Sequence, residues 1–139
     1  MIELFDYAAL EPPVIKDRLS ELTRWLFENK FPDTELPEDY TEFLRESNGG
    51  DFVKNDREFQ MFKAEEIPGF YEAYMFGEFM PYALPFAADG CGNLYIFDKR
   101  SSGSAVYLVD AGNMGWDGDG FELLAESFLD CINGNFKQS

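Results

Sequence analysis

The stretch WDGDGFE, residues 116–122, holds the acidic side chains whose spacing comes nearest to a metal site. Asp117, Asp119 and Glu122 offer the hard oxygen ligands that calcium prefers. The spacing fails the EF-hand pattern, because Phe121 stands where that loop needs its third oxygen ligand. Asp-Gly pairs are more typical of tight turns, in which Asp bonds to the local backbone and Gly supplies a positive φ. We therefore expect no metal and no other cofactor, with a calcium site as an alternative.

No catalytic constellation stands out. Because the chain has no histidine, it lacks the base of Ser-His-Asp and Cys-His catalysis and the nitrogen ligand that zinc most often binds. Cys91 would act as a nucleophile only if a basic group or a helix N-terminus lowered its pKa. The phosphate-binding patterns GxGxxG and GxxxxGK[ST] are absent. Two carboxylates across a cleft could hydrolyse a glycoside. With 27 Asp and Glu in the chain, however, some pair will have a suitable separation by chance, so such a pair is weak evidence for an enzyme. We expect no catalytic residues, with a carboxylate-based enzyme as an alternative.

The same loop has the side chains of a protein-binding surface. Trp116 is a large amphipathic residue of the kind enriched in binding hot spots, and it lies in a run without Lys or Arg from Ser101 to Phe136. Carboxylates around it would pair with Arg or Lys of a basic partner. The predicted partner-binding residues are Asp89, Asp110, Trp116, Asp117, Asp119 and Glu122. The alternative is that Trp116 only caps the core near the last helix.

The charge balance restricts the class of partner. The formal net charge is -16, and Lys99 and Arg100 are the only bases in residues 64–136. The electrostatic field of so strongly negative a protein repels phosphate backbones and anionic lipid, and it attracts basic proteins or cations. We therefore predict a basic protein partner, with neither nucleic acid nor membrane as a direct ligand. The alternative is that the charge only keeps the protein in solution, and the oligomeric state stays open.

Length and composition fit a single globular domain over residues 1–139. Domains commonly have about 100 to 150 residues, and 45% of the residues are hydrophobic. The N-terminus lacks a basic region followed by an apolar run, and no stretch approaches the length of a membrane span. Cys91 and Cys131 are too few for a disulfide scaffold. These features predict a cytoplasmic protein.

Apolar periodicity predicts helices at both ends of the chain. Residues 14–29 carry the stripe of an amphipathic helix, and the tail 121–132 carries a second apolar face. Residues 65–74 allow a short helix, which Pro68 and Gly69 weaken.

An aromatic run, residues 70–86, overlaps that short helix. It holds seven aromatic side chains, more than one helix face can bury, so some are expected to border an exposed patch. Met75 and Met80 would add adaptable surface there.

Short apolar runs separated by turn residues predict strands. One hairpin is expected from residues 52–53 and 59–62, and a second from 84–87 and 94–97. The stretch SAVYLVD, residues 104–110, supplies a further strand. Because the loops are too short for βαβ crossovers, the predicted fold is α+β, with a mostly antiparallel central sheet flanked by N-terminal, short middle and C-terminal helices.

The stretch LPEDYTEFLRESNGGDF, residues 36–52, combines a helix start, an apolar face and a glycine stop. It resembles the signature of the SUKH superfamily, which includes the fungal Smi/Knr cell-wall assembly regulators and many bacterial toxin-immunity proteins. LPFAADGCGNLYIFD, residues 84–98, is similar to the glycine-turn hairpin of that family, and AESFLDCI, residues 125–132, to its closing helix. The matching residues of the first block are Leu36, Pro37, Tyr40, Phe43, Leu44, Asn48, Gly49 and Gly50.

The resemblance implies an α+β fold with a central antiparallel sheet, no catalytic residues and a binding role. For bacterial members that role is commonly to neutralise a toxin, often a nuclease, of contact-dependent or polymorphic toxin systems. We therefore expect an immunity protein that covers a basic toxin domain. The alternative is a regulatory scaffold that binds cellular proteins, as in the fungal relatives.

Overall fold

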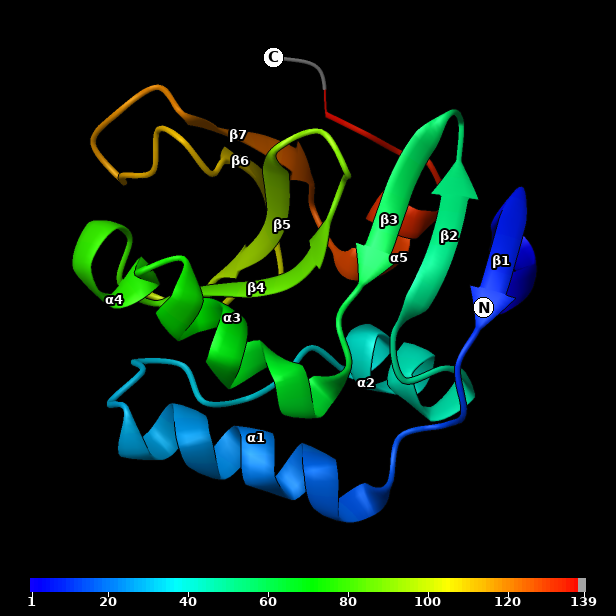
Figure 1. Cartoon of the computed structure of the whole chain (residues 1–139), viewed down its shortest axis with the longest axis horizontal. Coiled ribbons are helices and arrows are strands. Elements are labelled where there is room, and N and C mark those ends of the chain that lie inside the picture. Colours follow the sequence, from blue (N-terminus) through cyan, green and yellow to red (C-terminus); the bar gives the residue numbers. More distant parts are fainter. Residues whose placement is uncertain (138–139) are drawn as a thin grey trace.

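Seven strands form one antiparallel sheet in the computed structural model, which describes residues 1–137 (Figure 1). Each strand pairs with the next strand along the chain, in the order β1 to β7. The strands are β1 Tyr7–Leu10, β2 Gly50–Lys54, β3 Arg57–Met61, β4 Ala83–Ala88, β5 Asn93–Asp98, β6 Val106–Asp110 and β7 Phe121–Ala125.

The helices are α1 Lys16–Glu28, α2 Glu38–Glu46, α3 Ile67–Ala73, α4 Phe76–Phe79 and α5 Phe128–Ile132, with 3-10 turns η1 Ile2–Leu4 and η2 Ala64–Glu66. Helices α1 to α4 lie in the β1–β2 and β3–β4 connections, and α5 follows the last strand. The predicted α+β class is confirmed, as are the helices predicted from residues 14–29, 36–52 and 65–74. Within residues 1–137, no helix has both the length and the apolar character that a bilayer crossing requires.

Both predicted hairpins are present. The β2–β3 hairpin turns at Asn55 and Asp56, whose φ angles of 51° and 63° are both positive, as a two-residue type I′ turn requires. β4 pairs with β5, and β5 pairs in turn with β6. The strand predicted within residues 104–110 is therefore confirmed.

The prediction of one helix over residues 121–132 was wrong in its first half. Residues 121–125 form β7, which pairs with β6, and the helix begins only at Phe128. The apolar run suits a strand as well as a helix face, and pairing with the free edge of β6 favours the strand. Ser127 then starts the helix, because its side chain accepts a hydrogen bond from the Asp130 N–H at 3.1 Å.

Two short elements carried no usable sequence signal. β1 has only four residues, two of them alanine, and exists through its pairing with β2. α4 also has four residues, and Met75 separates it from α3 by adopting a φ of 59°. Both depend on tertiary contacts that a local pattern does not contain.

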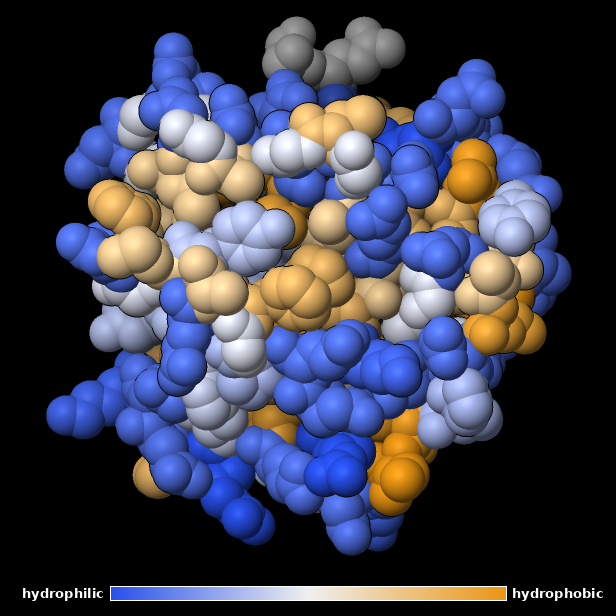
Figure 2. Space-filling model, viewed as in Figure 1, coloured by the Kyte–Doolittle hydropathy of each residue, from blue (hydrophilic) through white to orange (hydrophobic). Residues whose placement is uncertain are grey.

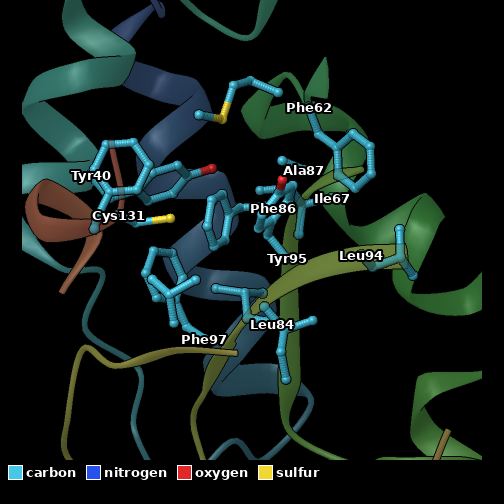
Figure 3. Packing of buried hydrophobic residues seen from close by; sticks show 14 of the residues in the cluster. Tyr40, Phe62, Ile67, Leu84, Phe86, Ala87, Leu94, Tyr95, Phe97 and Cys131 are labelled. Atoms are coloured by element: carbon cyan, nitrogen blue, oxygen red, sulfur yellow. The ribbon is translucent and has the colours of Figure 1, made fainter. Parts of the chain in front are cut away.

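Aromatic rings from α2, α5 and the central strands form the core. The ring centroid of Tyr40 lies 5.6 Å from that of Phe86 and 5.3 Å from that of Phe97. Phe128 of α5 lies 5.3 Å from Tyr40 on the same side. Figure 3 shows Tyr40 facing Phe86 and Phe97 across this cluster. Residues 83–87 are all buried, so β4, near the middle of the sheet, is covered on both faces.

The turn after α2 joins distant parts of the chain through Asn48. Its side-chain amide donates to Glu65 Oε1 at 2.8 Å, and its Oδ1 accepts from the Ala64 N–H at 2.9 Å. Its backbone N–H donates to the Pro12 carbonyl at 2.9 Å. Asn48 therefore fixes the segment before α1 and the start of η2 to the end of α2.

The two glycines that follow leave no room for side chains. Gly49 has a φ of 91°, and a Cβ there would lie 2.9 Å from the Met61 carbonyl oxygen. Gly50 has a φ of 110°, and its Cβ would lie 2.5 Å from the Ala9 carbonyl oxygen. The chain thus passes between two neighbouring strands at a spacing that only glycine permits.

Replacing Asn48 by Ala is expected to lower the free energy of unfolding by about 1–3 kcal/mol, because the buried Ala64 N–H loses its acceptor. Urea denaturation measures the change. Asn113→Ala is the control, since Asn113 is exposed and bonds only within a surface loop. A loss at Asn48 no larger than at Asn113 would contradict the bridging role.

Tyr40→Phe is expected to raise the free energy of unfolding or leave it unchanged. Within the described chain the buried Tyr40 hydroxyl has no hydrogen-bond partner, and burying such a group costs about 1–3 kcal/mol. Tyr95→Phe is the matched comparison, because the Tyr95 hydroxyl donates to the Glu58 carbonyl at 2.8 Å. That variant should lose about 1 kcal/mol in the same denaturation measurement. Equal losses in both variants would refute the difference.

Candidate functional site

Residues 111–120 connect β6 to β7 and lie among the predicted binding residues. The loop closes because the Asp110 N–H donates to the Gly120 carbonyl at 2.7 Å. Asp119 accepts a hydrogen bond from the Asn113 side chain at 3.1 Å. Gly120 cannot be replaced without rearrangement, since a Cβ there would overlap the Asn113 carbonyl oxygen. The Asp-Gly repeat therefore builds a turn, as its composition suggests.

Three of the predicted residues lie together. Asp110, Asp119 and Glu122 are exposed and border an open depression of about 390 Å³. Leu108 and Phe121 contribute apolar surface to it, and its lining includes no Lys or Arg. In residues 1–137 no group of three acids, cysteines or histidines is arranged to hold a metal ion. The carboxylates point to solvent, where they can meet Arg or Lys of another protein.

Asp89 lies in the β4–β5 turn, which occupies its carboxylate. Oδ1 accepts from the backbone N–H groups of Cys91 and Asn93 at 2.8 and 3.1 Å, and Oδ2 accepts from the Asn93 side chain at 2.8 Å. Partial burial raises the pKa of Asp89, but these bonds and the charge of Arg57 outweigh it, so the pKa lies below its ordinary value of 3.8. Asp89 therefore shapes the hairpin. It does not line the depression beside Asp110 and Glu122, whereas its hydrogen-bond partner Asn93 does.

Trp116 is half-buried and already engaged within the protein. Its indole N–H donates to the Pro81 carbonyl at 2.8 Å, and its ring meets Phe121 edge-on, 5.5 Å between centroids. The Arg100 guanidinium lies 3.6 Å from the ring centroid, a cation–π contact. Trp116 thus fastens the loop to the segment after α4. It also packs against the core, as the alternative interpretation expected, but through Pro81 and Phe121. Asp117, the next residue, is exposed.

The two bases of the second half of the chain are held by other partners. Arg100 forms two bonds to Asp98, at 3.0 and 2.8 Å, and these raise the pKa of Arg100. Lys99 is buried, with Nζ 2.6 Å from Asp33 Oδ2 and a further bond to the Glu35 carbonyl. In the part of the chain that the structure describes, the loop carboxylates therefore form no ion pair with either base, although the nearby charge of Asp117 also helps to raise the pKa of Arg100.

The two cysteines are both free thiols. Cys91 is exposed in the β4–β5 turn, whereas Cys131 is buried in α5, and burial raises the pKa of Cys131 to about 12. Cys131 is therefore a protonated core residue at neutral pH.

A second surface, absent from the predicted site, lies at the α3–α4 corner. Tyr74, Met75 and Phe79 are 38%, 49% and 50% exposed, and Figure 2 shows apolar surface gathered over α3 and α4. The prediction that the aromatic run borders an exposed patch is confirmed. Met80, expected to add surface, is fully buried instead, because it follows α4 into the core. The seven aromatic residues within 70–86 were the sequence signal that could have added this corner to the predicted partner-binding site.

The profile of the SMI1/KNR4 family (SUKH-1) matches residues 21–134. The chain belongs to this family. The match includes the stretch 36–52, so the resemblance seen in the sequence is confirmed. No curated protein matches the sequence. SUKH proteins are generally non-catalytic, and membership supports a protein-binding domain. In this SUKH-1 protein the family signature builds α2 and the turn after it, whereas the predicted partner-binding acids lie on other elements.

Asp89→Asn tests whether the negative charge of Asp89 stabilises the β4–β5 turn. Because the pKa of Asp89 is lowered in the folded protein, its charge stabilises the fold above the ordinary pKa of 3.8, and this contribution is lost as pH falls through the lower folded value. Wild type should melt above the variant at neutral pH, and the difference should shrink as the pH falls below the ordinary pKa of 3.8. Thermal melts across pH measure it, with Glu42→Gln on α2 as the control. A pH-independent difference would exclude a contribution from the charge.

Proposed function

We propose that this SUKH-1 protein is a cytoplasmic immunity protein, a non-catalytic binder that neutralises a basic toxin domain of a bacterial contact-dependent or polymorphic toxin system. The observation that carries the proposal is the exposed acidic loop between β6 and β7, whose carboxylates are not paired with Lys99 or Arg100. Family membership supports the broader class of protein-binding domain. Our proposal goes further than this class, because it names the bound protein as a toxin and the effect of binding as its neutralisation.

The chemistry of a nuclease explains why an acidic surface would inhibit one. A nuclease holds its substrate through Lys and Arg that contact phosphates. Carboxylates of Asp110, Asp117, Asp119 and Glu122 would occupy those same cations and so exclude the substrate. The net charge of -16 would also steer a basic toxin toward the protein and speed association.

The loop is suited to binding because its conformation is already fixed. The Trp116 to Pro81 hydrogen bond and the close packing of Gly120 on Asn113 hold it without a partner. A surface that is ordered in advance loses less conformational entropy on association, which raises affinity.

The test is calorimetric titration with the purified C-terminal domain encoded by the open reading frame directly upstream, at low and high salt. We expect nanomolar binding that weakens as salt rises. The triple variant Asp117→Asn, Asp119→Asn, Glu122→Gln should bind at least about tenfold more weakly and show a flatter salt dependence.

A control of equal charge change lies on other elements: Asp17→Asn, Glu28→Gln and Glu42→Gln, on α1 and α2. It should retain most of the affinity. If the loop variant kept both wild-type affinity and wild-type salt dependence, the loop would not be the binding surface. No binding at either salt would reject this toxin pairing and favour a regulatory scaffold that binds other cellular proteins.

A further inference from the structure

Packing holds the α3–α4 corner rigidly at the surface. The Tyr74 ring stacks on Phe70 at 6.4 Å and lies 6.3 Å from Phe76, which is fully buried. Phe70 in turn stacks on Phe62 at 3.9 Å between centroids. An exposed aromatic that is fixed in this way gives up little side-chain entropy when a partner covers it.

Met75 adopts a left-handed backbone conformation at the start of α4, where its carbonyl accepts hydrogen bonds from the N–H groups of Glu78 and Phe79, both at 3.1 Å. Its φ of 59° and ψ of 38° lie in the left-handed region, which is unfavourable for residues other than Gly, Asn and Asp. Its side chain is 49% exposed, so it gains little from burial. Gly or Asn would suit the backbone better, so the Met75 side chain is not needed for the turn and is available for a contact outside the chain.

The corner also contains a depression of mixed character. Tyr71, Met75 and Gly77 line about 260 Å³ together with Glu72 and Glu78. Tyr71 is buried, whereas both carboxylates are exposed, so the depression is apolar at its base and acidic at its rim. This combination suits the aliphatic stem of a partner's Arg or Lys, with its charged group at a carboxylate.

The corner and the acidic loop are neighbours. The Trp116 N–H bonds to Pro81, just after α4, and a Cβ on Gly115 would lie 4.0 Å from the Phe79 carbonyl oxygen. Figure 1 shows the β6–β7 loop (orange) beside α4 at one end of the molecule. An apolar surface and an acidic surface therefore form one continuous face.

We infer that the α3–α4 corner is the apolar anchor for a basic, amphipathic segment of a protein partner. Apolar side chains of the segment pack on Tyr74, Met75 and Phe79, while its Arg or Lys side chains reach Glu72, Glu78 and the neighbouring loop. Charge complementarity selects this occupant, because a second copy of so acidic a chain would be repelled. The inference rests on the proposed function and adds to it the site and the chemistry of the bound segment.

The test uses the full chain and two synthetic peptides. One is an amphipathic helix-forming peptide of Lys and Leu, and the other has every Leu replaced by Ser at the same charge. Calorimetry should show the Leu peptide binding at least about tenfold more tightly than the Ser peptide. Amide chemical-shift changes caused by the Leu peptide should centre on residues 72–79.

Met75→Asn separates binding from folding. Asn tolerates the left-handed conformation, so the melting temperature should stay equal or rise, while affinity for the Leu peptide falls about tenfold. Phe79→Ser should weaken binding likewise. Tyr7→Ser is the matched control, because Tyr7 is 59% exposed on β1, and β1 lies at the opposite side of the molecule from α4 in Figure 1.

The outcomes distinguish this inference from the proposed function. Equal affinity for both peptides, or unchanged binding by Met75→Asn, would overturn the anchor while leaving charge-based binding intact. Shift changes confined to the β6–β7 loop would do the same. If neither peptide bound, charge-based recognition and the anchor would both be rejected.

Discussion

The turn from Asn48 to Gly50 is the constraint on which the rest of the structure depends. Within three residues the chain must leave α2 and enter the sheet beside β1. Backbone carbonyls of Ala9 and Met61 stand so close to Gly50 and Gly49 that neither position can hold a Cβ without a shift. The Asn48 side chain meanwhile bonds to η2, which sets the direction in which α3 begins. The turn therefore ties α2 to the start of η2 and, through the Pro12 carbonyl, to the segment before α1.

Different residues of the sequence build the core and the predicted binding surface. The buried cluster is almost entirely aromatic and aliphatic. Within residues 1–137 the one buried charged residue, Lys99, is paired with Asp33. Among the exposed carboxylates, Asp117 and Asp119 of the β6–β7 loop lie outside the helices and strands. Such residues can change with little effect on the core, as loops carried by a rigid scaffold commonly do. A family signature that lies in the fold thus gives no information about which partner a member binds.

Local patterns were sufficient where a single residue type determines the backbone. Asn48-Gly49-Gly50 predicted the end of α2, where both glycines have positive φ angles. They were insufficient for residues 121–125, where an apolar run suits either a helix or a strand and the free edge of β6 decides. Acids on the β6–β7 loop could be predicted as exposed from composition alone. The packing of Trp116 on Arg100 and its bond to Pro81 could not, because they join residues that are distant in sequence.

Trp116 shows how an internally bonded residue can govern recognition. Its ring and N–H are used within the protein, so little of it remains to contact a partner. Yet the Trp116 to Pro81 bond joins the acidic loop to the segment after α4. The position of the acidic loop relative to the α3–α4 corner is therefore set by this bond. A partner that binds both surfaces must have its basic and apolar groups at the same separation. Trp116 would then contribute to specificity by positioning the loop, and its truncation would weaken binding without the loss of any direct contact.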